Sequence, residues 1–146
     1  MTPLITVILP CYNSAATLHW AIAPLIAQTY QEWECIFVDD GSSDRPDTIL
    51  RPFFDERVRF FRRPKNRGRG AARRFGVEQA RGKYITFLDA DNWLFPSKFD
   101  TQFRIMESEE RLPMVSLEWP SWVGKVTWPA FGHRVAAQAP STPNLR

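Results

Sequence analysis

The chain has 146 residues, of which 44% are hydrophobic and 14% are aromatic. This length and composition suffice for one folded domain with a single core, and they exclude a disordered chain. No apolar run approaches the roughly 20 residues that a membrane-spanning helix requires. The first residues lack the basic and apolar segments of a secretion signal, so we expect a cytoplasmic location.

The formal net charge of +3 hides an uneven distribution of charge. The basic segment 57–74 contains nine of the nineteen basic residues and no acidic residue, so the rest of the chain is acidic. A segment of this kind raises the local concentration of anions such as nucleotide phosphates, nucleic acid or lipid headgroups. The alternative is a solvated loop without a ligand.

The two cysteines, Cys11 and Cys35, lie in or beside apolar runs with strand character. A reduced cysteine in such a run behaves as a small apolar residue. Neither cysteine has the spacing of a metal site, so we assign no chemistry to them.

The N-terminal part of the chain predicts a strand followed by a helix. Residues 5–9 form a short β-branched run that is ended by Pro10, which is typical of a buried parallel strand. Residues 13–14 are suited to cap the following helix. We expect Pro24 to kink or shorten this helix, which should end near residues 28–30.

The remaining pattern alternates strands and helices. In order, we expect a strand over 34–38, a helix over 48–54 interrupted near Pro52, a strand over 58–61, a helix over 71–80, a strand over 83–88 and a helix over 96–108. This alternation predicts an α/β fold with a largely parallel sheet flanked by helices on both faces. Prolines and tryptophans replace the pattern near the end, so we divide the chain into a domain over 1–111 and an atypical tail over 112–146.

Acidic residues follow two of the predicted strands. Asp89 and Asp91 directly follow the last predicted strand, and Asp39 and Asp40 follow the second one. Ligands of open parallel sheets lie beyond the carboxyl ends of the strands, so we expect these acids to meet the loop 10–13 at one edge of the sheet. Two carboxylates one residue apart can share a divalent cation; the alternative is that they begin a loop and cap the next helix.

Four segments follow one another along the chain in a specific order. They are residues 7–13 (VILPCYN), 37–44 (FVDDGSSD), 66–73 (NRGRGAAR) and 82–91 (GKYITFLDAD). Together they closely resemble the nucleotide-sugar-binding part of family 2 glycosyltransferases of GT-A fold, over roughly residues 4–110. The resemblance implies a Rossmann-like half-domain, a nucleotide-diphosphate-sugar donor that is usually UDP-linked, and a divalent metal, Mg or Mn.

The resemblance also implies which residues contact the nucleoside of the donor. The loop of Pro10, Tyr12 and Asn13 should lie against the nucleoside, with Tyr12 packing on the base. Asp40 is similar to the acid that hydrogen-bonds the uracil ring, and Asp39 is expected to help position it.

A second set of residues is implied for the diphosphate. Asp91 resembles the carboxylate that coordinates the metal, and Asp89 is expected to contact the ribose or the water shell of the metal. Arg73 resembles the basic residue that faces the donor near the pyrophosphate. A metal ion and a guanidinium would stabilise the negative charge that grows on the leaving diphosphate.

The general base of an inverting transferase, which takes the proton of the acceptor hydroxyl, is not assigned. The resemblance places this acid in the second half of the domain, which we expect this chain to lack. Glu118 is the only acid after Arg111, and its surroundings do not resemble the motif of the base. The second hypothesis is therefore a truncated, inactive module that binds a nucleotide sugar.

A third and more remote interpretation is nucleic-acid binding by the basic segment 57–74. The run over residues 67–70 resembles arginine-glycine segments that contact RNA backbones. One such repeat is weak evidence, and the donor site accounts for the same glycines without nucleic acid.

Three tryptophans stand close together in the tail, Trp119, Trp122 and Trp128. They are suited to pack over the core or to form an exposed patch for a partner, a sugar ring or a membrane surface. A tail that left a sheet face uncovered would favour oligomerisation.

Overall fold

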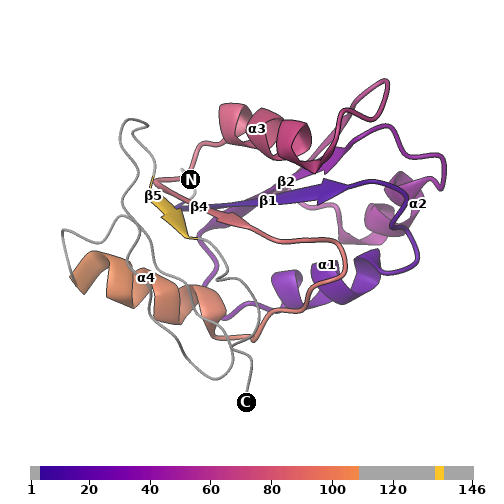
Figure 1. The fold of residues 1–146 in the computed structure, drawn as a ribbon. Helices are drawn as coiled ribbons and strands as arrows, with labels where there is room; N and C mark the ends of the chain where they lie inside the picture. The colour runs from indigo at the N-terminus through magenta and orange to yellow at the C-terminus, as the bar shows by residue number, and fades with distance from the viewer. Residues whose placement is uncertain (1–3, 109–133, 137–146) are drawn as a thin grey trace, which may run out of the picture.

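The structure, a computed structural model, describes residues 4–108 and 134–136. Its elements in chain order are β1 (Ile5–Cys11), α1 (Leu18–Ile26), β2 (Trp33–Asp39), α2 (Pro46–Leu50), the 3-10 helix η1 (Arg51–Phe53), β3 (Val58–Arg62), α3 (Arg69–Gln79), β4 (Tyr84–Phe87), α4 (Lys98–Ser108) and β5 (Arg134–Ala136). The five described strands form a sheet in the order β3-β2-β1-β4-β5, and each adjacent pair is parallel (Figure 1). The predicted α/β fold with a parallel sheet is confirmed.

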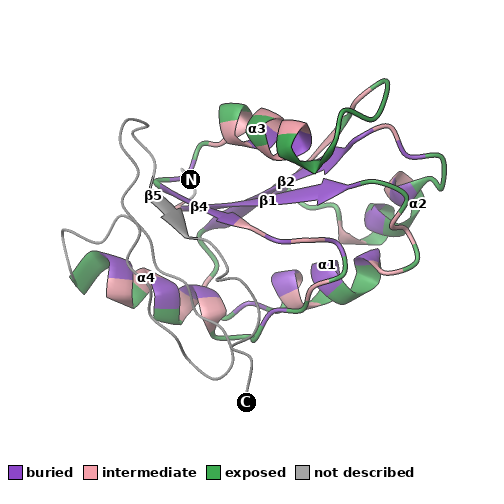
Figure 2. Cartoon of the chain, in the orientation of Figure 1, coloured by how far each residue is buried: buried purple, intermediate pink, exposed green. Residues whose placement is uncertain are grey.

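The strands contribute side chains to two cores, one on each face of the sheet, because successive residues of a strand point to opposite faces. Val7 and Leu9 of β1 belong to the larger core, which also contains residues of α1 and α4. Ile36 and Val38 of β2 pack with Ala72 of α3 on the other face. Figures 1 and 2 show α3 on one side of the buried strands and α1 and α4 on the other. Helices on both faces, as predicted, are confirmed.

Strand β1 continues through Pro10 to Cys11, two residues beyond its predicted end. Pro10 lies opposite Val38 of β2, and the Cys11 carbonyl accepts a hydrogen bond of 2.8 Å from the backbone N–H of Asp40. On its other side β1 pairs with β4 only as far as Ile8. A proline has no N–H to donate, so the ladder between β1 and β4 ends where Pro10 would be the next donor.

Helix α1 begins at Leu18, later than predicted, because Asn13 does not cap it. Asn13 has a positive φ of 49°, and its Oδ1 accepts a hydrogen bond of 2.9 Å from the N–H of Ser43 instead. The helix ends at Ile26 with Pro24 in its last turn, before the predicted end at residues 28–30.

Smaller differences occur in the other helices. The predicted interruption near Pro52 is present as the 3-10 turn η1 after α2. Helix α3 begins two residues before its predicted start, directly after Gly68, whose φ of 89° suits a residue without a side chain. Helix α4 begins at Lys98, two residues after its predicted start.

The segment 112–146, expected to be a separate tail, supplies β5, which extends the sheet beyond β4. The tryptophans named above and Glu118 lie outside the described residues. None of the helices within residues 4–108 is both long and apolar enough to span a membrane.

We predict that Gly76→Ala destabilises the protein, because a Cβ at Gly76 would clash with Cγ2 of Ile8 on β1. Overpacking of this kind costs about 1–3 kcal/mol in the free energy of unfolding, which urea denaturation measures. The matched control is Gly70→Ala on the same helix, where a Cβ would meet no atom within 4 Å. This control should be neutral or slightly stabilising, and equal loss in both variants would contradict the close packing of α3 on β1.

Candidate functional site

A pocket of about 470 Å³ lies at the carboxyl edge of the sheet. Its lining residues come from the end of β1 and the loop after it, from the segments that follow β2 and β4, and from the loop before α3 and the first turn of α3: Pro10, Cys11, Tyr12, Asn13, Ser14, Ala16, Thr17, Asp40, Asn66, Arg69, Ala72, Asp89, Ala90 and Asp91. The connections that leave β1 and β4 run to opposite parts of the sheet. The pocket therefore occupies the topological switch point, where ligands of open parallel sheets bind.

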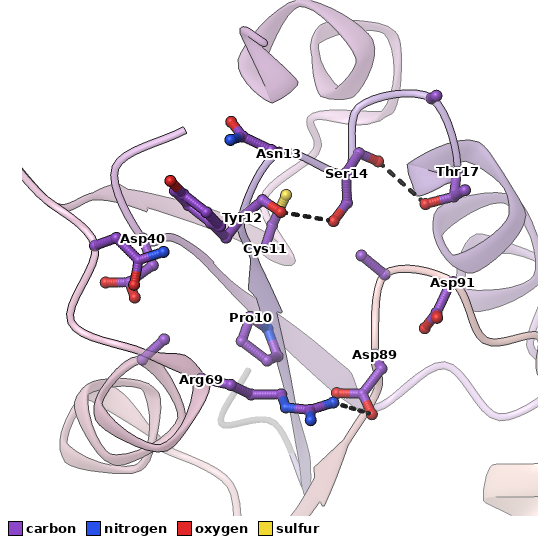
Figure 3. A pocket seen from close by; sticks show the side chains of 14 residues that line it. Pro10, Cys11, Tyr12, Asn13, Ser14, Thr17, Asp40, Arg69, Asp89 and Asp91 are labelled. Carbon is purple, nitrogen blue, oxygen red and sulfur yellow. Dashed lines mark hydrogen bonds and ion pairs between the residues drawn. The ribbon is translucent and has the colours of Figure 1, made fainter. Parts of the chain in front are cut away.

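The loop after β1 is fixed by hydrogen bonds to the loop after β2. The N–H of Asn13 donates to Oγ of Ser42 at 3.0 Å, and the N–H of Ala15 donates to Oδ2 of Asp44 at 2.7 Å. Directly before these anchors, Tyr12 is about half exposed (48%) and lines the pocket. The aromatic ring of Tyr12 thus lies exposed at the wall of the pocket (Figure 3).

Asp39 is fully buried and does not line the pocket. Its Oδ1 accepts a hydrogen bond of 2.8 Å from the N–H of Ser42. Its Oδ2 accepts no hydrogen bond from the described residues but lies 3.5 Å from Nε of Arg62. Asp39 therefore stabilises the turn after β2 through this hydrogen bond and is not part of the pocket wall.

Asp40 is also buried, with an exposed fraction of 2%, but it does line the pocket. Its Oδ1 accepts a hydrogen bond of 2.8 Å from Nη1 of Arg63, and its Oδ2 accepts one of 3.0 Å from the backbone N–H of Arg67. Asp40 thereby ties the loop before α3 to the end of β2.

The acidic pair after β4 has two different environments. Asp89 is partly buried, and its Oδ1 accepts a hydrogen bond of 2.7 Å from Nη2 of Arg73. Its Oδ2 lies 3.7 Å from Nη1 of Arg69. Asp91 is exposed, and its carboxylate has no ion pair or hydrogen bond to any part of the chain that the structure describes.

Arg73 lies outside the set of residues that line the pocket. Besides its bond to Asp89, its guanidinium carbon lies 5.3 Å from the ring centre of Phe87. Asp89 thus lines the pocket, whereas Arg73 binds Asp89 without lining the pocket itself.

Acidic residues neutralise most of the basic segment 57–74. The ion pairs are Arg57–Asp55, Arg59–Glu34, Arg62–Asp39, Arg62–Asp47, Arg63–Asp40, Arg69–Asp89, Arg73–Asp89 and Arg74–Glu78. Lys65 and Arg67 are exposed, and their side chains form no ion pair with any described residue. The positive charge left for an external anion is therefore smaller than the sequence suggested.

Several pocket residues had not been singled out from the sequence. Asn66 and Arg69 belong to a segment that carried the family resemblance, so their motif was a signal. Ser14 and Thr17 had no comparable signal as pocket residues; they lie between the end of β1 and the start of α1.

Among the described residues, no group of three or more histidine, cysteine or acidic side chains is arranged to hold a metal ion. The acidic residues that line the pocket are Asp40, Asp89 and Asp91.

The fold and the pocket together define a Rossmann-like α/β protein with a pocket at the switch point of a parallel sheet. Residues 6–140 match the glycosyl transferase family 2, and the chain belongs to this family.

A similar relative is an uncharacterized glycosyltransferase of Haemophilus influenzae, 42% identical over 106 residues. That alignment covers 71% of this chain and 42% of the relative, so the chain spans about two fifths of its length.

Two solved structures share the fold. Staphylococcus aureus TarS 1–349 in complex with UDP-GlcNAc is 21% identical, with a TM-score of 0.74 over 79% of this chain and 34% of that one. The mannosyltransferase PcManGT of Pyrobaculum calidifontis, in complex with GDP-Man and Mn²⁺, is 21% identical, with a TM-score of 0.72 over 81% of this chain and 36% of that one.

We predict that the thiol of Cys11 is unreactive although it lines the pocket. Burial raises its pKa to about 11, because a thiolate loses its hydration there. The thiolate, which is the reactive form, is then about one part in a thousand at pH 8. Iodoacetamide labelling, followed by peptide mass spectrometry, should be slow at pH 8 and accelerate as the pH approaches 11. Labelling of Cys11 as fast as free cysteine at pH 8 would contradict this environment.

Proposed function

We propose that this chain binds a nucleotide-diphosphate sugar, most simply a UDP-sugar, for transfer of the sugar to a hydroxyl acceptor. The observation that carries the proposal is the pocket itself. It brings the exposed ring of Tyr12 and the carboxylates of Asp40, Asp89 and Asp91 to one edge of the sheet. TarS, which has the same fold, is known in complex with UDP-GlcNAc.

Tyr12 and Asp40 are suited to hold the nucleoside. The half-exposed ring of Tyr12 offers a face on which a base can stack. The two oxygens of Asp40 accept one hydrogen bond each from the protein. Since a carboxylate has about four acceptor positions, Asp40 can still accept an N–H of a uracil ring. Pro10 and Asn13 complete the wall on this side, and Asp39 supports it from the buried turn.

Asp89 and Asp91 fit a divalent cation, Mg or Mn. Such ions prefer oxygen ligands and retain waters when a protein supplies only one or two carboxylates. Asp91 is exposed and without a protein partner among the described residues. When bound, the cation would neutralise negative charge on the donor's diphosphate. Arg73 would keep Asp89 oriented by their 2.7 Å hydrogen bond.

A binding module without transfer is the second candidate. No described acidic residue lining the pocket is left over as a general base once Asp40, Asp89 and Asp91 are assigned to the donor. A turnover measurement therefore separates the two candidates.

We predict that UDP binds this chain more tightly with Mn²⁺ than without it, as measured by calorimetry. Asp91→Asn should remove this gain, which amounts to about tenfold or more in affinity, because the ion loses a charged ligand. The matched control is Asp100→Asn on α4, whose carboxylate pairs with Arg104 within the helix. This control should keep the metal-dependent gain.

The same samples also give the turnover. Release of UDP from a UDP-sugar would support a transferase, whereas metal-dependent binding without release would support the binding module. If the native chain bound no nucleoside diphosphate with or without metal, the proposed function would be wrong.

A further inference from the structure

The charges around the pocket are unequally compensated. Three carboxylates line it, those of Asp40, Asp89 and Asp91. Among the described residues that line the pocket, Arg69 carries the only basic side chain. A diphosphate that enters this pocket therefore meets one guanidinium in a wall that is otherwise acidic or neutral.

The guanidinium of Arg69 makes only a weak interaction with the rest of the protein. Its Nη1 lies 3.7 Å from Oδ2 of Asp89, beyond hydrogen-bond distance, and 69% of its side chain is exposed. Arg73 holds the other oxygen of Asp89 at 2.7 Å, with 35% of its side chain exposed. Exposed ion pairs contribute little stability, so Arg69 can leave Asp89 at small cost while Arg73 keeps Asp89 in place.

The backbone position of Arg69 is nevertheless well defined. It is the first residue of α3, and this helix packs on the sheet through Ala72 and Gly76. The side chain extends from this fixed start toward Asp89 (Figure 3). Arg69 therefore combines a fixed backbone position with an exposed charged end.

We propose that Arg69, and not Arg73, is the residue that binds the diphosphate of the donor. This inference rests on the proposed function of the same pocket. A guanidinium can donate two parallel hydrogen bonds to phosphate oxygens, and the exposed end of Arg69 has donors available for them. Arg73 is a positioning residue, since its guanidinium is engaged with Asp89 and Phe87 and does not line the pocket.

The test compares uridine, UMP and UDP by calorimetry on the native chain and on Arg69→Gln. UDP affinity should fall about tenfold in Arg69→Gln, the size expected for a lost charge-assisted hydrogen bond, whereas uridine affinity should not change. Arg69→Lys should recover part of the loss. The matched control is Arg74→Gln on the same helix, whose side chain is 84% exposed and paired with Glu78, and it should bind all three ligands as the native chain does.

Two results would overturn the inference while leaving the proposed function intact. One is native UDP affinity in Arg69→Gln. The other is an equal loss for uridine and UDP, which would indicate a distorted pocket instead of a lost phosphate contact. Absence of UDP binding by the native chain would instead overturn the proposed function, and the role of Arg69 with it.

Discussion

The carboxylates buried at the end of β2 constrain the whole site. Asp39 and Asp40 are at most 2% exposed, and buried charges of this kind are tolerated only with compensating partners. The neighbouring strand supplies them, since Arg62 ends β3 and Arg63 follows it. The pairing fixes the end of β3 and the loop toward α3 against the end of β2, and this loop forms one wall of the pocket.

Compensation of charge by a neighbouring strand also accounts for the arginines clustered in the basic segment 57–74. A basic segment without acids indicated a surface for external anions, yet its guanidiniums mostly face acids that are distant in the sequence, such as Glu34 opposite Arg59. Sequence alone could not distinguish a free charge from a compensated one, because the distinction depends on the parallel register that places β3 beside β2. The positive charge that remains for a ligand is confined to the region where α3 begins.

The fold could be predicted because its signals are local. Short β-branched runs that end in acids mark buried strands, and the alternation with helices sets a parallel sheet. The details that failed depend on tertiary contacts. Asn13 looked like a helix cap, but its side chain bonds Ser43, which is thirty residues away. The role of Arg73 toward the donor stays a prediction, and its hydrogen bond to Asp89 is visible only in three dimensions.

Pro10 lacks the backbone N–H that would continue the pairing of β1 with β4, and this has a consequence for the shape of the pocket. Pairing between β1 and β4 stops at Ile8, before Pro10, so the two strands are free to separate at the edge where the pocket lies. The gap between β1 and β4 at this edge thus follows from the backbone of Pro10 and does not depend on any one side chain that lines the pocket. Exchange of a lining side chain such as Tyr12 or Arg69 would therefore change the chemistry of the pocket wall and leave this separation of the strands in place.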